Sequence, residues 1–283
     1  MTEKFFVAGH PVGHSLSPVI HSVFFEHFGM KEKYGTKDIL PEEFKNEVEI
    51  FKKSGVVGFN VTIPHKISAF EMLDVVDDYT KMVGAVNTVE FKQGKVYGYN
   101  TDGIGFIKAL EKNGISVKGK TVCILGAGGA VNSIAVKTHL EGGKIIILAR
   151  RKEQADAICK KQGFGSSDYI ENINKYTFDI LVNATPVGMH PNEGTSPIEE
   201  IKECEFVYDL IYNPGRTEFL RRATEKGIKC DNGLWMLVYQ AAASFEIWTG
   251  KALDESAIDE AYKRVLLTLE GKKWMLCLPG LWV

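Results

Sequence analysis

The sequence has few cysteines, no long hydrophobic run and almost no excess charge, and each shortage argues against a class of protein. Its five cysteines are spread over 283 residues without a CxxC pair, which argues against a disulfide scaffold and favours reduced thiols in the cytoplasm. No apolar run approaches the roughly 20 residues of a membrane span, and the N-terminus shows no signal-peptide pattern. The net charge of -2 gives no general attraction to nucleic acid or to an anionic membrane. The seven histidines show no metal-ligand spacing, so no metal site is expected.

What the sequence does contain is an alternation of short apolar strands and helical segments, most regular in its second half. A chain of this length normally forms two domains. Strands that alternate with helices are typical of an α/β protein with a parallel sheet. We therefore expect an α/β fold with two domains.

The middle of the chain carries a glycine-rich turn between an apolar strand and a helix. Residues 122–125 form a short apolar run, as in a strand buried on both faces. Gly126, Gly128 and Gly129 follow, and a helix is expected over 130–140. The N–H groups and dipole of such a helix start favour a phosphate, and glycine lets a pyrophosphate approach the backbone. The pattern predicts a dinucleotide site, and the alternative is an ordinary glycine-rich turn.

The end of the next strand indicates which dinucleotide is bound. An acidic residue here would bind the ribose 2′-hydroxyl of NAD, but the sequence has Arg150 and Arg151. Two cations at a helix N-terminus are unfavourable, and a 2′-phosphate would relieve their repulsion. This favours NADP over NAD, and the alternative is a solvated basic turn.

Pairs of polar residues in the N-terminal part are spaced so that they share one side of the chain. Ser15 and Ser17 lie two apart, just before a helix expected over 18–28, so both hydroxyls can face a carboxylate. The alternative is that Ser17 only caps this helix and Ser15 is solvated. Asn60 and Thr62 share a face by the same alternation.

Lys66 and Asp102 are the candidates for proton transfer. Pro64 ends a strand and starts a helix expected over 65–73, with Lys66 in its first turn. The helix dipole disfavours a positive charge there, which suits an amine that gives up its proton. Asp102 precedes another helix, at the expected domain boundary. The alternatives are a solvated lysine and a helix cap.

Eight short motifs follow one another along the chain. They are Ser15-Leu-Ser-Pro18, Asn60-Val-Thr-Ile-Pro-His-Lys66, Gly84-Ala-Val-Asn-Thr88, Asn100-Thr-Asp-Gly103, Gly126-Ala-Gly-Gly-Ala130, Asn183-Ala-Thr-Pro-Val-Gly-Met189, Tyr208-Asp-Leu-Ile-Tyr-Asn-Pro214 and Met236-Leu-Val-Tyr-Gln-Ala-Ala242. In this order they resemble the shikimate dehydrogenase family across almost the whole chain. The resemblance implies a substrate-binding domain over 1–101 and 239–283, a Rossmann-type NADP-binding domain over 102–238, and a cleft between them. The implied reaction is the reversible, NADP-dependent reduction of 3-dehydroshikimate to shikimate in aromatic amino acid biosynthesis.

The resemblance also implies roles for the residues at matching positions. Lys66 and Asp102 would form the catalytic pair. The substrate would be held by Ser15, Ser17, Asn60, Thr62, Lys66, Asn87, Asp102, Tyr212 and Gln240. The nucleotide would be lined by Gly126, Ala127, Gly128, Gly129, Ala130, Arg150, Arg151, Thr185, Val187, Leu210 and Gly233. The expected partner is a small-molecule substrate, with a homodimer possible and no nucleic acid, membrane or metal.

Some positions depart from the family pattern. Ala149 and Arg151 replace the usual Asn and the usual Thr or Ser on either side of Arg150, and Trp235 stands where Gly is common. The apolar tail over 274–283 lies outside the pattern. Three other activities stay open: a quinate/shikimate dehydrogenase that uses NAD, a methylenetetrahydrofolate dehydrogenase, and a non-catalytic nucleotide-binding regulator.

Overall fold

The computed structural model describes residues 4–276, and the chain divides into two compact units. The first unit comprises the chain up to Thr101 together with the chain from Ala241. The second comprises Asp102–Gln240. From residue 277 on, the apolar tail lies outside the described residues.

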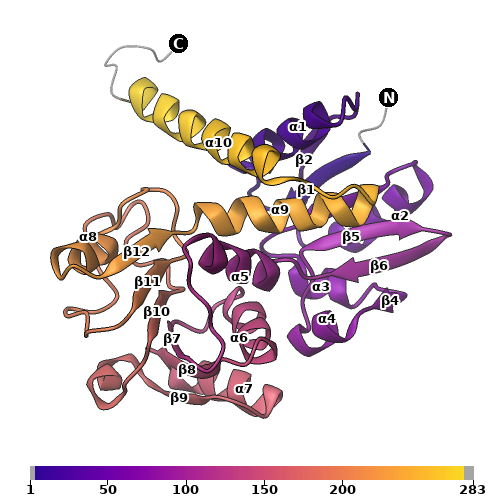
Figure 1. Ribbon diagram of the computed structural model, residues 1–283. Helices are drawn as coiled ribbons and strands as arrows, with labels where there is room; N and C mark the ends of the chain where they lie inside the picture. The colour runs from indigo at the N-terminus through magenta and orange to yellow at the C-terminus, as the bar shows by residue number, and fades with distance from the viewer. Residues whose placement is uncertain (1–3, 277–283) are drawn as a thin grey trace. The chain divides into compact units, whose positions relative to one another are not determined.

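A six-stranded mixed sheet organises the first unit (Figure 1). In spatial order its strands are β2 (Tyr34–Asp38), β1 (Phe5–Gly9), β3 (Gly58–Val61), β5 (Thr88–Lys92), β6 (Lys95–Tyr99) and β4 (Val75–Val76). β1 pairs in parallel with β2 and β3, whereas β5 runs antiparallel to β3 and forms a hairpin with β6. The antiparallel register sets Asn60 opposite Thr88.

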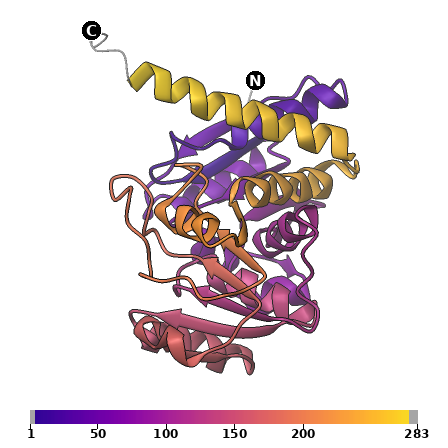
Figure 2. The ribbon, with the colours of Figure 1, turned by 60° about the vertical axis from the view of Figure 1, so that its left-hand side comes forward.

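Helices cover both faces of this sheet. They are α1 (Ser17–His27), α2 (Phe44–Lys53), α3 (Lys66–Phe70), α4 (Asp78–Val83), α10 (Glu255–Leu276) and the end of α9 (Leu234–Thr249). On one face, the Phe6 and Phe59 rings pack on Phe51 of α2. On the other, the Phe5 ring centroid lies 5.3 Å from that of Phe25 in α1 and 5.4 Å from that of Trp248 in α9. α10 packs on α1 and is one continuous helix (Figures 1 and 2).

The second unit contains a six-stranded sheet in which every pairing is parallel. In spatial order its strands are β9 (Ser166–Tyr169), β8 (Lys144–Ala149), β7 (Thr121–Leu125), β10 (Ile180–Asn183), β11 (Phe206–Asp209) and β12 (Lys229–Asn232). The chain builds outward from β7 to β9, then restarts beside β7 and builds outward from β10 to β12. This is the strand order of dinucleotide-binding sheets, and it confirms the predicted Rossmann-type α/β fold.

Apolar clusters cover both faces of the second sheet. Val122 and Ile124 belong to one cluster, and Cys123 and Leu125 to the other. Successive side chains of a strand point to opposite faces, so an uninterrupted apolar run is what a strand buried on both faces requires. The helices of this unit are α5 (Asp102–Lys112), α6 (Val131–Leu140), α7 (Lys152–Gln162), the 3-10 helix η1 (Ile170–Lys175), α8 (Glu218–Glu225) and the first part of α9.

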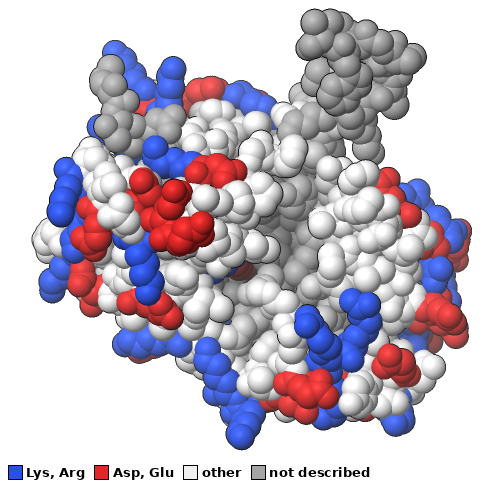
Figure 3. Space-filling view, turned by 180° about the vertical axis from the view of Figure 1, so that it is seen from behind, with Lys and Arg blue, Asp and Glu red and all other residues white. Residues whose placement is uncertain are grey.

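The charged side chains are mixed in sign on the face that Figure 3 shows. Lysines and arginines alternate there with aspartates and glutamates, without a broad field of one sign. Among the described residues, no helix is long and apolar enough to cross a membrane. The same residues contain no cluster of three or more His, Cys, Asp or Glu side chains that could hold a metal ion.

Candidate functional site

The glycine turn directly follows β7, at the point in the second sheet where the strand order restarts with β10. The Gly126 N–H donates to the Leu148 carbonyl at 2.8 Å, and the φ of Gly126 is 107°. A Cβ at this position would lie 3.0 Å from the Ala184 carbonyl oxygen. Both the backbone conformation and the close approach of the β10 loop therefore require glycine at Gly126.

Gly128 and Gly129 differ, because no atom of the described residues fills the space beside them. A Cβ on Gly129 would meet no atom within 4 Å, and the nearest atom to one on Gly128 would be the Ala184 oxygen at 4.0 Å. Packing does not require glycine at either position. The turn instead leaves its backbone open directly before α6, which suits the approach of a phosphate.

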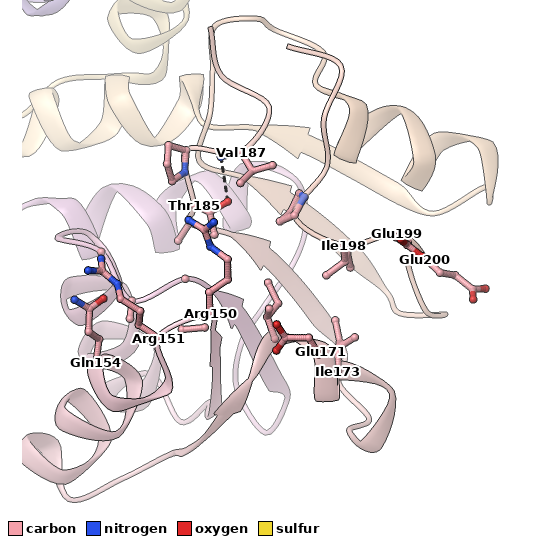
Figure 4. Close-up of a pocket in the computed structure, with 18 of the residues that line it drawn as sticks. Arg150, Arg151, Gln154, Glu171, Ile173, Thr185, Val187, Ile198, Glu199 and Glu200 are labelled. Atoms are coloured by element: carbon pink, nitrogen blue, oxygen red, sulfur yellow. Dashed lines mark hydrogen bonds between the residues drawn. The ribbon is translucent and has the colours of Figure 1, made fainter. Parts of the chain in front are cut away.

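A cavity of about 710 Å³ opens beside this turn (Figure 4). Of the predicted nucleotide residues, it is lined by Gly126, Ala127, Gly128, Arg150, Arg151, Thr185 and Val187. Gly129, Ala130, Leu210 and Gly233 are not part of its lining. The volume is in the range of cofactor sites, and its place at the carboxyl ends of the strands is where such sheets bind ligands.

Two exposed arginines stand at one side of the cavity. In Figure 4, Arg150 extends from the end of β8 toward Thr185, and Arg151 lies beside Gln154. The neighbouring Lys152 is neutralised by Asp156, with Nζ 2.7 Å from Oδ2. Within the described part of the chain, no ion pair involves Arg150 or Arg151. Their charges are therefore available to an anionic ligand.

The cavity also contains residues that the sequence analysis missed. They include Gln154, Glu171, Asn174 and residues 197–200. Only Gln154 had a usable signal, because it lies one helical turn beyond Arg150 and Arg151. The other residues belong to segments without a recognisable motif, and only the folded chain brings them to the cavity.

The loop after β10 is held by side-chain hydrogen bonds. The Asn183 Oδ1 atom accepts from the N–H of Thr185 at 3.0 Å and from its hydroxyl at 2.7 Å. The Thr185 Oγ1 atom in turn accepts from the Val187 N–H at 3.2 Å. These bonds fix the two loop residues predicted to line the nucleotide.

Leu210 and Gly233 meet at the neighbouring strand ends. A Cβ on Gly233 would lie 2.1 Å from the Leu210 carbonyl oxygen, so only glycine allows the two backbones to come this close. Tyr212 follows on the same segment and is half-buried, and burial raises the pKa of its phenol.

The start of α5 and the middle of α9 pack tightly within the second unit. A Cβ on Gly105 would lie 2.6 Å from the Met236 carbonyl oxygen and 2.9 Å from the Gln240 Cβ. Asp102 is buried one turn before Gly105, on the same side of α5. The Gln240 side chain donates to the Leu237 carbonyl at 2.8 Å.

In the first unit, the Asn60 amide lies at the centre of a buried polar cluster. Its Oδ1 atom accepts from the Tyr34 hydroxyl at 2.6 Å. Its Nδ2 atom donates to the Asn87 carbonyl at 3.0 Å, the Thr88 hydroxyl at 3.2 Å and the Ser244 hydroxyl at 3.0 Å. Burial raises the pKa of Tyr34, although hydrogen bonds to Ser17 and Asn60 act in the opposite direction.

Asn87 fixes the residue that precedes Asp102. Its Nδ2 atom donates to the Thr101 hydroxyl at 2.8 Å, and its Oδ1 atom accepts from the Thr101 N–H at 2.8 Å. Asn87 and Thr101 are both buried. The backbone is therefore held in one position at the point where it enters the second unit.

The remaining predicted residues of the first unit lie on short connections. α1 begins at Ser17 with Leu16 as its N-cap and no side-chain cap, so the expectation that Ser17 caps this helix is wrong. The Ser15 Oγ atom instead accepts from the Ser17 N–H at 3.3 Å. Thr62 lies just beyond β3.

Lys66 is half-buried at the start of α3, and its carbonyl accepts from the Val86 N–H at 3.1 Å. This joins the helix start to the segment that carries Asn87. α3 ends at Phe70 rather than at residue 73, because the Met72 N–H turns back to the Ala69 carbonyl in a tighter bond.

The sequence matches two family models. One is described as the shikimate dehydrogenase substrate binding domain and matches residues 7–89. The other is described as the shikimate 5'-dehydrogenase C-terminal domain and matches residues 233–261.

Individual relatives extend the similarity over most of the chain. A shikimate dehydrogenase (NADP(+)) of Caldanaerobacter subterraneus subsp. tengcongensis is 44% identical over 268 residues, which cover 92% of this chain and 96% of that protein. A solved chorismate mutase/shikimate 5-dehydrogenase fusion protein from Clostridium acetobutylicum has a TM-score of 0.90 at 35% identity, covering 95% of this chain and 99% of that one. Shikimate 5-dehydrogenase from Thermus thermophilus, solved with NADP(H) and shikimate, has a TM-score of 0.85 at 35% identity, covering 93% and 99%. Because these similarities run through both units and almost the whole of each relative, the chain belongs to the shikimate dehydrogenase family, as the eight motifs predicted.

Proposed function

We propose that this protein is an NADP-dependent shikimate dehydrogenase, which reversibly reduces 3-dehydroshikimate to shikimate in aromatic amino acid biosynthesis. The observation that carries the proposal is the 44% identity to a relative of that activity over almost its full length. The cavity independently supports the use of NADP, because Arg150 and Arg151 line it directly after β8, where NAD would be bound by an acidic residue.

The residues of the second unit fit NADP. Open backbone at Gly128 and Gly129 leaves room for a pyrophosphate at the start of α6. Arg150 and Arg151 supply positive charge for a 2′-phosphate. When bound, the nicotinamide supplies the hydride acceptor or donor.

The protein itself has to bind the substrate and move one proton. In this proposal the Lys66 amine takes the proton from the substrate hydroxyl, and Asp102 orients Lys66 and the ring. The proposal also assigns the side chains of Ser15, Ser17, Thr62, Tyr212 and Gln240 to binding the carboxylate and ring of the substrate.

Asn60 and Asn87 are assigned to substrate binding by the same proposal. Asn60 already donates to three acceptors, so its main contribution is to hold Tyr34 and the segment of Asn87 in place. The Asn87 amide donates to the Thr101 hydroxyl and accepts from the Thr101 N–H, so its side chain is held in a fixed orientation for the contact that the proposal assigns to it.

The proposal extends to the roles of the two units. The first, with the chain from Ala241, would bind the substrate, and the second would bind NADP. The enzyme would act in the cytoplasm. A homodimer stays a prediction, which light scattering of the purified protein measures.

The experiment is a set of initial rates with shikimate and quinate, each against NADP and NAD, followed at the NADPH absorbance band. Shikimate with NADP should give the highest kcat/KM. A higher value for quinate with NAD would favour the quinate/shikimate dehydrogenase alternative. No turnover with any pair would contradict the proposal and favour a regulator that binds the nucleotide without catalysis.

A further inference from the structure

Asp209 is a buried carboxylate that the proposed reaction does not use. It is the last residue of β11 and has no exposed surface. Its Oδ1 atom accepts from the Asn183 amide at 3.0 Å and from the Ile211 N–H at 3.1 Å. Its Oδ2 atom accepts from the Thr217 hydroxyl at 2.6 Å. All of these donors are neutral, so the charge of Asp209 is stabilised by hydrogen bonds alone.

A buried carboxylate without a cation is costly, and the electrostatics reflect this. Burial raises the pKa of Asp209 to about 6, although the hydrogen bonds from Thr217, Ile211 and Asn183 favour the charged form. A buried apolar residue would avoid this cost.

One side of Asp209 leads to the nucleotide cavity. The Asn183 amide that donates to Asp209 also reaches the Val187 carbonyl at 3.3 Å. The oxygen of the same amide holds the N–H and hydroxyl of Thr185. Thr185 and Val187 line the cavity. Asp209 therefore orients the amide that shapes this wall.

The other side of Asp209 leads to the segment after β11. The carboxylate accepts from the Ile211 N–H, next to Leu210 and Tyr212. The Leu210 N–H donates to the Asn183 carbonyl at 2.9 Å, which joins the two strand ends a second time. Thr217, whose hydroxyl also caps α8 by accepting from the Leu220 N–H at 3.3 Å, closes this segment.

We propose that Asp209 is a positioning residue for the nucleotide site: it fixes the loops after β10 and β11 against each other, so that the Thr185–Val187 wall keeps the arrangement that binds NADP. The inference rests on the proposed function, since it assumes that this cavity binds NADP. A role in stability alone would lower the melting temperature without changing the affinity of the folded protein for nucleotide. Affinity therefore separates the two roles.

The experiment measures the Kd for NADPH by fluorescence titration, well below the melting temperature of each variant. Asp209→Asn keeps the shape but replaces one acceptor oxygen by an NH2 donor, so it cannot accept from Asn183, Ile211 and Thr217 together. Thr217→Val removes the hydroxyl donor. Each should raise the Kd about fivefold, the equivalent of one hydrogen bond. Thr217→Ser keeps the hydroxyl and should restore an affinity close to that of the wild type.

Asp179→Asn is the matched control. Asp179 accepts from the Thr121 N–H at 2.7 Å and precedes the amino end of β10, the end opposite to Asn183. It should leave the Kd for NADPH unchanged.

Wild-type affinity in Asp209→Asn and Thr217→Val, even with lower melting temperatures, would overturn the positioning role. If Asp209→Asn does not fold, the comparison of Thr217→Val with Thr217→Ser decides. Failure of the wild type to bind NADPH would instead contradict the proposed function, so the two failures are distinguishable.

Discussion

Replacing Arg150 and Arg151 together by alanine should change the nucleotide preference of the enzyme. Both side chains are exposed and line the cavity, so each contact to a 2′-phosphate is partly screened by water. A hydrogen bond to a charged group is worth about 1.5 to 3 kcal/mol, and exposure favours the lower value. Two such contacts correspond to about a hundredfold loss of NADP affinity. NAD has no 2′-phosphate, so its KM should change little.

The assay is a measurement of kcat/KM for NADP and for NAD, at low and at high salt. The NADP value of the double variant should fall about a hundredfold and depend less on salt, because fewer charges are screened. The single variants Arg150→Ala and Arg151→Ala divide the effect between the two side chains.

Lys152→Ala is the matched control, because it removes a cation from the same turn that is already paired with Asp156. It should leave the preference for NADP nearly unchanged. Equal losses for NADP and NAD in the double variant would refute the assignment of the arginines to the 2′-phosphate.

Three further predictions follow from the site. Lys66→Ala should lose most of kcat with a smaller change in the Kd for shikimate, and an unchanged kcat would remove Lys66 from proton transfer. Gly129→Ala should keep a near-wild-type melting temperature, since its methyl group meets only open space, but it should weaken NADPH binding. Gly126→Ala should unfold at a lower temperature because the φ of Gly126 is 107°. Equal melting temperatures for the two variants would contradict this. Burial raises the pKa of Asp209 from 3.8 to about 6, so the folded protein binds a proton more tightly than the unfolded chain does. The resulting contribution to the free energy of unfolding is fully present below pH 3.8 and is lost as the pH rises through 6. In urea unfolding, the free energy of unfolding of the wild type should therefore rise by about 2 kcal/mol relative to Asp209→Asn between pH 7 and pH 4. Parallel curves for the two proteins would exclude this titration.

The sequence predicted the parts of the site that depend on local pattern. The apolar run at 122–125, the glycines after it and the arginines at Arg150 and Arg151 each have a physical signature within a few residues. The family resemblance added the roles of individual residues in binding and catalysis, which local sequence patterns do not contain. β9 was missed because its sequence, Ser-Ser-Asp-Tyr, has no apolar alternation and pairs only at the edge of the sheet.

Contacts between distant segments could not be predicted in the same way. The Asn60 amide is engaged by Ser244, which is 184 positions away, and nothing near Asn60 indicates that partner. Asp209 lies within one of the eight motifs, but its role depends on Thr217 and Asn183, which only the folded sheet brings to it. The acidic residues in the cavity wall likewise have no sequence signal.

The first sheet is completed by residues near the end of the chain. Ser244 joins the cluster around Asn60, and the Trp248 indole donates to the Val89 carbonyl at 2.9 Å over Gly58, where a Cβ would come within 2.2 Å of the indole nitrogen. During translation, the strands of this sheet are therefore synthesised long before α9, the helix that covers them. The residues of the second unit are continuous in sequence, so this unit can fold before the part of α9 that completes the first unit has been synthesised. A chain truncated after residue 240 would contain the whole second unit but would lack the residues of α9 that complete the first.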